Sequence, residues 1–119
     1  MDNKEFGRQL EIRTKKFAIC VKKLSASLSN PTEGRVIRNQ FTKSGTSIGA
    51  NYREANRARS KADFFSKIKI CESESSETAY WLEIIRDLNW IGNSNTEELL
   101  TEVNELLAIF TSAGKTLKP

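Results

Sequence analysis

Histidine is absent from this sequence of 119 residues. It is the side chain that most often transfers protons at neutral pH, and it is the commonest nitrogen ligand of zinc, copper and iron. The two cysteines, Cys20 and Cys71, are too few for a structural zinc site and fall at apolar positions of expected helices. We therefore expect no catalytic residue, no metal and no cofactor, and two reduced, buried thiols.

Proline and glycine are scarce, at two and six residues, and long hydrophobic runs are missing. No uncharged apolar stretch approaches the roughly 18 residues that would cross a membrane. With 29% charged and 38% hydrophobic residues, the composition is typical of one compact domain with a hydrophobic core. Residues 1–4 are polar, and no signal peptide follows them. We expect a single domain over residues 1–119, no membrane contact and a cytoplasmic location.

Charge is distributed unevenly along the chain. Residues 1–24 hold seven Lys and Arg against three Asp and Glu, and residues 35–69 hold nine against two. Residues 70–119 reverse the balance, with three basic and nine acidic side chains. Such polarity indicates either a basic surface for a polyanion or complementary patches through which copies of the chain dock head to tail.

Apolar residues recur at helical spacing throughout, and no segment alternates with period two for long enough to predict a strand. The expected helices cover about residues 4–28, 31–57, 61–91 and 95–113. Four amphipathic helices joined by short connections bury their apolar stripes most simply as an antiparallel bundle. The predicted fold class is all-α, an antiparallel up-and-down four-helix bundle.

Several residues predict where these helices begin and end. Asn30 and Pro31 suit the N-cap and first position of the second helix. Ser60, with Asp63 three residues later, resembles a capping box at the start of the third. Gly92 is expected to end that helix in a left-handed conformation.

Two glycines, Gly45 and Gly49, fall inside the second helix. Each destabilises an exposed helix by roughly 1 kcal/mol relative to alanine. Their presence predicts a close approach of another backbone at this point.

Polar residues follow one side of the second helix: Ser47, Asn51 and Glu54 stand at i, i+4 and i+7. Glu77 on the third helix is a possible partner. Further candidates at helical spacing are Ser73, Ser76 and Tyr80. Glu54 and Glu77 could form a carboxylate pair for acid–base chemistry or metal binding, but bundle metal sites usually combine Glu with His. We favour a structural polar seam of Ser47, Asn51, Glu54 and Glu77 that fixes helix register.

Basic residues cluster around the junction of the second and third helices. The best-placed candidates for nucleic-acid contact are Arg38, Lys43, Arg53, Arg57, Arg59 and Lys61. Cations of the first helix extend this surface: Arg13, Lys15, Lys16, Lys22 and Lys23. Phosphate contacts need no base-specific geometry, and no RNA-recognition or zinc-finger signature is present. The alternatives are an ordinary solvated face, or a protein-interaction scaffold without nucleic-acid binding.

Apolar side chains late in the third helix cover more of its circumference than one bundle seam requires. They include Tyr80, Trp81, Ile84 and Leu88, with Trp90 beyond them. Aromatic residues outside a seam pack under a neighbouring loop or against another subunit. We favour an oligomer interface.

The segment Ser47-Ile48-Gly49-Ala50-Asn51, followed by Glu54, resembles a pattern of one protein family: Ser-Ile-x-x-Asn-x-x-Glu. Ser75-Ser76-Glu77 resembles the family's Ser-x-Glu pattern in the third helix, and Ala55 stands where the family usually has glycine. The family comprises four-helix bundle proteins encoded in intervening sequences of bacterial 23S ribosomal RNA genes. The resemblance extends from about Phe6 to Phe110.

This resemblance implies a left-handed bundle that assembles as a homopentamer. It also implies kinship with the accessory variability determinant proteins of diversity-generating retroelements, which bind nucleic acid and a reverse transcriptase. The expected function is that of a non-enzymatic homo-oligomer that binds the phosphate backbone of RNA or DNA.

Overall fold

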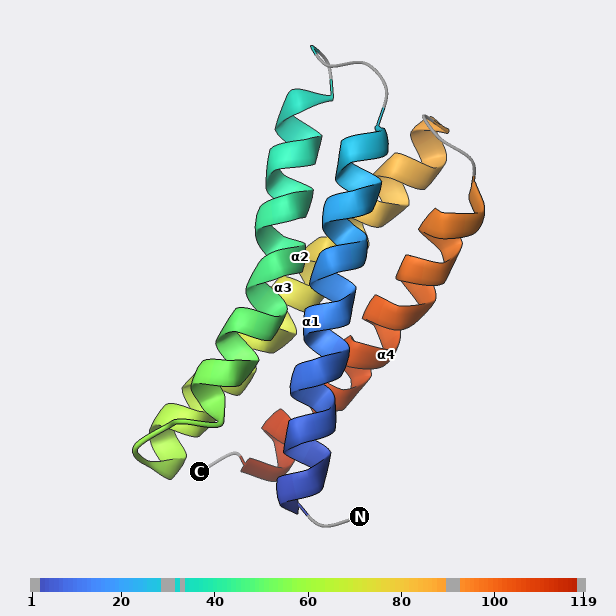
Figure 1. The fold of residues 1–119 in the computed structure, drawn as a ribbon. Coiled ribbons are helices and arrows are strands. Elements are labelled where there is room, and N and C mark those ends of the chain that lie inside the picture. Colours follow the sequence, from blue (N-terminus) through green and yellow to red (C-terminus); the bar gives the residue numbers. More distant parts are fainter. Residues whose placement is uncertain (1–2, 29–31, 33, 90–92, 118–119) are drawn as a thin grey trace.

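The computed structural model describes residues 3–28, 32, 34–89 and 93–117. It contains four helices: α1 (Asn3–Ser27), α2 (Arg35–Ala55), α3 (Lys61–Leu88) and α4 (Asn93–Leu117). Successive helices run antiparallel around an elongated bundle of 44 × 25 × 20 Å, and the start of α1 lies at the same end of it as the end of α4 (Figure 1). This confirms the predicted all-α, up-and-down four-helix bundle. No helix in the described part of the chain is long and apolar enough to cross a bilayer.

The core is built from the apolar stripes of all four helices. Its fully buried large side chains include Val21 of α1, Phe41 and Ile48 of α2, Ile68, Leu82 and Ile85 of α3, and Val103, Leu106 and Phe110 of α4. Each helix packs against its two neighbours, but α1 and α4 make the fewest contacts of any adjacent pair. One side of the bundle is therefore packed less extensively than the other three.

The α1–α2 contact is close because of the two predicted glycines. A Cβ atom at Gly45 would lie 2.7 Å from Val21 Cγ2, and one at Gly49 would lie 3.1 Å from Thr14 Oγ1. One helical turn from Gly45, Thr42 Oγ1 donates a hydrogen bond of 2.8 Å to Ser25 Oγ. The predicted close backbone approach is confirmed, and it fixes the register of α1 on α2.

Helix ends agree with the sequence prediction at the start of α3. Ser60 is the N-cap, and its Oγ accepts a hydrogen bond of 3.0 Å from the Asp63 backbone N–H. Asp63 Oδ2 accepts from the backbone N–H of Arg59 at 3.4 Å rather than from that of Ser60, so the capping box is shifted by one residue.

Other helix ends differ from the prediction. α2 begins at Arg35, not at residue 31, with Gly34 as an N-cap that offers no side-chain hydrogen bond. Asn30 and Pro31 lie outside the described residues, and α2 ends two residues earlier than predicted. Gly34 offers no capping hydrogen bond because glycine lacks the side-chain oxygen of a typical N-cap residue.

The end of α3 is also earlier than predicted. Asn89, with φ 55°, takes the left-handed conformation that was expected of Gly92, because asparagine tolerates this region better than most residues other than glycine. Gly92 lies outside the described residues. α4 begins at Asn93 and runs to Leu117, beyond the predicted end at residue 113. Gly114 does not end it, because a glycine within a helix lowers stability without forcing a break.

Candidate nucleic-acid interface

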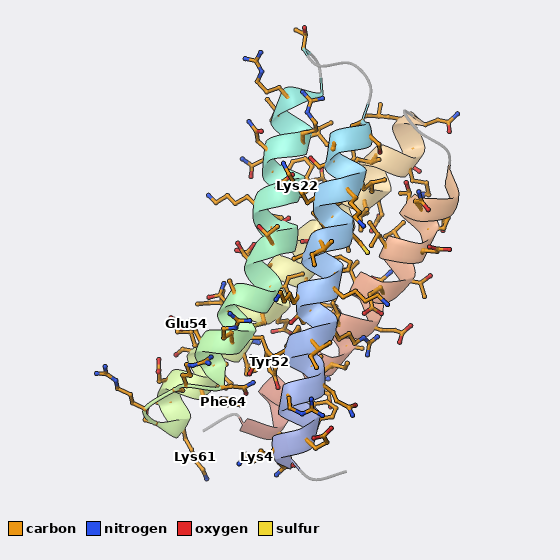
Figure 2. The ribbon with its side chains drawn as sticks, in the orientation of Figure 1. Lys4, Lys22, Tyr52, Glu54, Lys61 and Phe64 are labelled. Atoms are coloured by element: carbon orange, nitrogen blue, oxygen red, sulfur yellow. The ribbon has the colours of Figure 1, made fainter. Side chains whose placement is uncertain are left out.

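A basic groove lies between α1 and α2, near the end of the bundle where Lys22 is labelled (Figure 2). Lys22 of α1 lines it together with Arg38 and Lys43 of α2, and polar support comes from Ser25 and Thr42. The two lysines are exposed and Arg38 is half-buried. The described lining of this groove contains no carboxylate. Lys22 and Lys43 therefore present positive charge that no carboxylate in the described lining of this groove neutralises.

Farther along the same pair of helices, Lys15 and Arg53 line a second groove. Two carboxylates, Glu11 and Glu54, share this lining. Arg53 Nε lies 3.6 Å from Glu11 Oε1, and the other oxygen of Glu11 accepts a hydrogen bond of 2.7 Å from Asn56 Nδ2. Arg53 is thus partly neutralised, and only Lys15 adds an unpaired positive charge within the described lining.

The remaining predicted cations form a basic corner where α2 passes to α3, comprising Arg53, Arg57, Arg59 and Lys61. All four are exposed, and Lys61 lies at the end of the bundle opposite Lys22 (Figure 2). Arg57 Nη1 donates to the Arg53 carbonyl oxygen at 3.3 Å, which places its charge at the carboxyl end of α2. Arg53 follows Lys43 by ten positions, which correspond to about 15 Å along the helix axis. The six predicted contact residues therefore fall into two groups along one side of the bundle.

Arg13 does not belong to this surface, although the sequence grouped it with the cations of the first helix. It faces α4, where Nε and Nη2 donate hydrogen bonds of 2.6 and 2.7 Å to the two oxygens of Glu102. Nη2 also lies 3.0 Å from Glu105 Oε1. The hydrogen bond with Glu102 raises the pKa of Arg13. This guanidinium holds α1 to α4, and helical rotation alone could not show which side of α1 faces α4.

Within the described residues, Ser47, Asn51 and Glu77 of the predicted polar seam form hydrogen bonds in their own helices and not between α2 and α3. Ser47 Oγ donates to the Lys43 carbonyl oxygen at 2.6 Å, and Asn51 Nδ2 donates to the Ser47 carbonyl oxygen at 2.8 Å. Both hydrogen bonds stay within α2. Glu77 likewise accepts within α3, from Trp81 Nε1 at 3.3 Å.

Glu54 and Glu77 line two different grooves, so the structure does not bring this predicted carboxylate pair into one pocket. No group of three or more acidic or cysteine side chains that could hold a metal occurs among the described residues.

Other side chains form hydrogen bonds between α3 and α2. Thr78 Oγ1 donates to Ser44 Oγ at 2.9 Å, and both side chains are fully buried. Cys71 Sγ of α3 also donates to the Ile48 carbonyl oxygen of α2 at 3.6 Å, and burial raises the pKa of this free thiol to about 12. Ser44 and Thr78 fall within the apolar stripes of their helices. A polar residue within an apolar stripe faces the core, so the sequence alone indicates that Ser44 and Thr78 are buried and need hydrogen-bond partners.

Beside Lys43, the α2–α3 surface carries two carboxylates. Glu74 is half-buried; this burial, and then the nearby charge of Glu77, raise the pKa of Glu74, while Lys43 opposes the shift. The basic groove therefore ends against an acidic flank on α3.

The predicted oligomer residues divide into two kinds. Tyr80 and Leu88 are 56% and 46% exposed, while Trp81 and Ile84 are half-buried. The rings of Tyr80 and Trp81 meet edge to face with centroids 5.2 Å apart, and Trp81 packs against the core. Trp90 lies outside the described residues. Trp81 thus packs between the core and the exposed ring of Tyr80.

Comparison with known proteins identifies the chain's family. Residues 8–112 match the model of the 23S rRNA-intervening sequence protein family. The fold is similar to the crystal structure of a protein of unknown function from the S23 ribosomal protein family of Bacteroides thetaiotaomicron, with a TM-score of 0.83 and 34% sequence identity over 92% of this chain and 97% of that one. No curated protein matches the sequence. The match over most of its length shows that the chain belongs to the 23S rRNA-intervening sequence protein family.

Proposed function

We propose that this protein binds the phosphate backbone of nucleic acid, without catalysis and without a cofactor, through the basic groove and the basic corner. The observation that carries the proposal is that Lys22 and Lys43 lie in one groove and make no salt bridge within the described residues. Cations left without acidic partners release the counterions of a polyanion on binding, and this release supplies affinity without sequence preference.

The spacing of the two groups suits an extended polyanion. About 15 Å of helix separates Lys43 from Arg53. Successive phosphates of one strand in a duplex advance about 3.4 Å along its axis, so roughly four phosphates span this distance. RNA is the first ligand to test, because the family is named for sequences within a ribosomal RNA gene.

The proposal includes self-association in the cytoplasm. Exposed Tyr80, supported by Trp81, is the anchor that favours a homo-oligomer. The family resemblance makes a pentamer the expected assembly. It also makes a reverse transcriptase a protein partner to test, through kinship with the accessory proteins of diversity-generating retroelements.

A second candidate function is a protein-interaction scaffold. It is favoured by the charge polarity of the chain, with acidic residues concentrated in residues 70–119. A scaffold of this kind predicts weak RNA binding together with oligomers that dissociate as the salt concentration rises.

The test compares two variants that each lose two positive charges. Lys22→Gln with Lys43→Gln alters the basic groove, and Lys69→Gln with Lys115→Gln removes the same charge from exposed positions on α3 and α4. Binding of a fluorescently labelled single-stranded RNA is measured by anisotropy across a series of salt concentrations. In a plot of log affinity against log salt, each lost phosphate contact lowers the magnitude of the slope by about 0.7. We expect a fall of about 1.4 for the groove variant and no fall for the control.

An unchanged slope in the groove variant would contradict the proposal. An equal fall in both variants would show that total charge, rather than the groove, determines binding. Undetectable RNA binding by the parent protein would favour the scaffold.

A further inference from the structure

The exposed large apolar side chains are concentrated on two helices that lie diagonally opposite each other. In the described part of the chain, three are on α1 (Phe6, Ile12 and Ile19), three are on α3 (Ile70, Tyr80 and Leu88), and one is on α2. α1 and α3 make no close contact with each other, because α2 and α4 separate them. Figure 1 shows α1 in front of the bundle and α3 behind it.

The outward side of α1 combines apolar and basic residues. Ile12, Lys16, Ile19 and Lys23 stand at i, i+4, i+7 and i+11, and all four are exposed. The isoleucines are 56% and 48% exposed. We call these four residues the α1 outer face.

The outward side of α3 combines apolar and acidic residues. Tyr80 has Glu77 three residues before it, Glu83 three residues after it and Ile84 four residues after it, so all three are its neighbours on the helix surface. Both glutamates are exposed and Ile84 is half-buried. We call these four residues the α3 outer face.

We infer that the α1 outer face of one copy of this chain binds the α3 outer face of the next copy. The inference rests on the self-association in the proposed function and names the two surfaces that carry it. Lysines flank the apolar residues of one face, and glutamates flank those of the other. Docking therefore buries isoleucines against Tyr80 while opposite charges meet at the rim.

The same distribution disfavours a two-fold contact through either face. Pairing α1 with α1 would set lysines against lysines, and pairing α3 with α3 would set glutamates against glutamates. A contact between two different faces on opposite sides of a subunit is heterologous, and its repetition gives a closed ring or an open filament. Arg57 and Arg59 of the basic corner belong to neither face, so the assembly leaves both accessible to a polyanion.

Charge reversal tests this pairing. The α1 variant carries Lys16→Glu and Lys23→Glu, and the α3 variant carries Glu77→Lys and Glu83→Lys. Sedimentation velocity at about 0.1 M salt measures assembly, and circular dichroism checks that each variant stays helical. Each variant alone sets like charges against each other, so we expect its association constant to fall by at least about 100-fold. A chain that carries all four substitutions restores the opposite-sign pairing and is expected to assemble as the parent does.

Mixing the two variants gives a second, sharper outcome. The acidic α1 face of one variant fits the basic α3 face of the other, and the reverse contact uses two unaltered faces. The mixture is therefore expected to assemble with alternating chains, and a closed ring then holds an even number of subunits.

Parent-like assembly of either variant alone would overturn the inference, as would failure of the four-substitution chain to assemble. A variant with Arg57→Gln and Arg59→Gln, which touches neither face, is expected to assemble as the parent does while binding RNA more weakly. This control separates a failure of the interface from a failure of nucleic-acid binding. A parent chain that stays monomeric would contradict self-association and leave the RNA test intact.

Discussion

The two sides of α1 are held to the bundle in different ways. Toward α2, the contact depends on shape: Gly45 accommodates Val21, and Gly49 accommodates Thr14. Toward α4, where packing is least extensive, it depends on charge, through the hydrogen bonds from Arg13 to Glu102.

This difference separates structural cations from available ones. The α1–α2 contact carries one long ion pair among the described residues, 3.6 Å between Arg53 and Glu11, while Lys15, Lys22 and Lys43 make no salt bridge there. The guanidinium that faces α4 is fully engaged. A positive residue on this bundle is therefore informative about function only once its carboxylate partners are known.

Gly45→Ala has the largest expected effect on the shape-dependent side. The new Cβ would lie 2.7 Å from Val21, whose branched side chain has little rotamer freedom on a helix. We expect a loss of about 2 to 3 kcal/mol in the free energy of unfolding, measured by urea denaturation. Gly114→Ala is the matched control, because its Cβ would meet Lys69 Cδ at an ordinary 3.5 Å, and it is expected to be neutral or stabilising. Equal stability of the two variants would show that the α1–α2 approach is not tight.

On the charge-dependent side, Arg13 and Glu102 are expected to be energetically coupled. Their two hydrogen bonds are short and join two guanidinium nitrogens to the two oxygens of one carboxylate, and both side chains are about one third exposed. A double-mutant cycle with Arg13→Gln and Glu102→Gln is expected to give a coupling free energy of about 1 kcal/mol. The coupling should fall when salt is raised to about 1 M. A coupling near zero at low salt would mean that α4 is held by the core alone.

The smallest expected effect concerns Glu74, on the acidic flank beside Lys43. Its pKa is raised above 4.5 in the folded state, mainly by burial, so the folded protein binds this proton more tightly than the unfolded chain does. The contribution of Glu74 to stability therefore decreases as pH rises from about 4.5 through the raised pKa. Glu74→Gln is expected to remove that decrease and to stabilise the protein slightly at pH 7. Thermal unfolding of the parent and the variant from pH 4 to pH 8 measures this difference in stability. A variant less stable than the parent at pH 7 would contradict the expectation.

The fold was predictable because its determinants are local and periodic. Apolar spacing located all four helices, Ser60 located the start of α3, and Gly45 and Gly49 indicated a close contact. The end of α3 was not found, because Leu88, Trp90 and Ile91 continue the apolar pattern past Asn89, where the helix ends.

The site was predictable in composition but not in arrangement. The sequence showed that cations are abundant, but only the packed helices separate Lys22 and Lys43 from Arg13. The polar seam was displaced for a related reason. Ser47 and Asn51 satisfy their polar groups on their own helix, and the buried hydroxyls of Ser44 and Thr78 bond across the interface.

Unpaired and paired cations on α1 are expected to differ in their contribution to RNA binding, and two single variants test this difference directly. Lys22→Gln and Arg13→Gln each remove one positive charge from α1, and the salt dependence of RNA binding is measured for both. We expect the slope of log affinity against log salt to fall by about 0.7 in magnitude for Lys22→Gln and to stay at the parent value for Arg13→Gln. Equal slopes for the two variants would contradict the account.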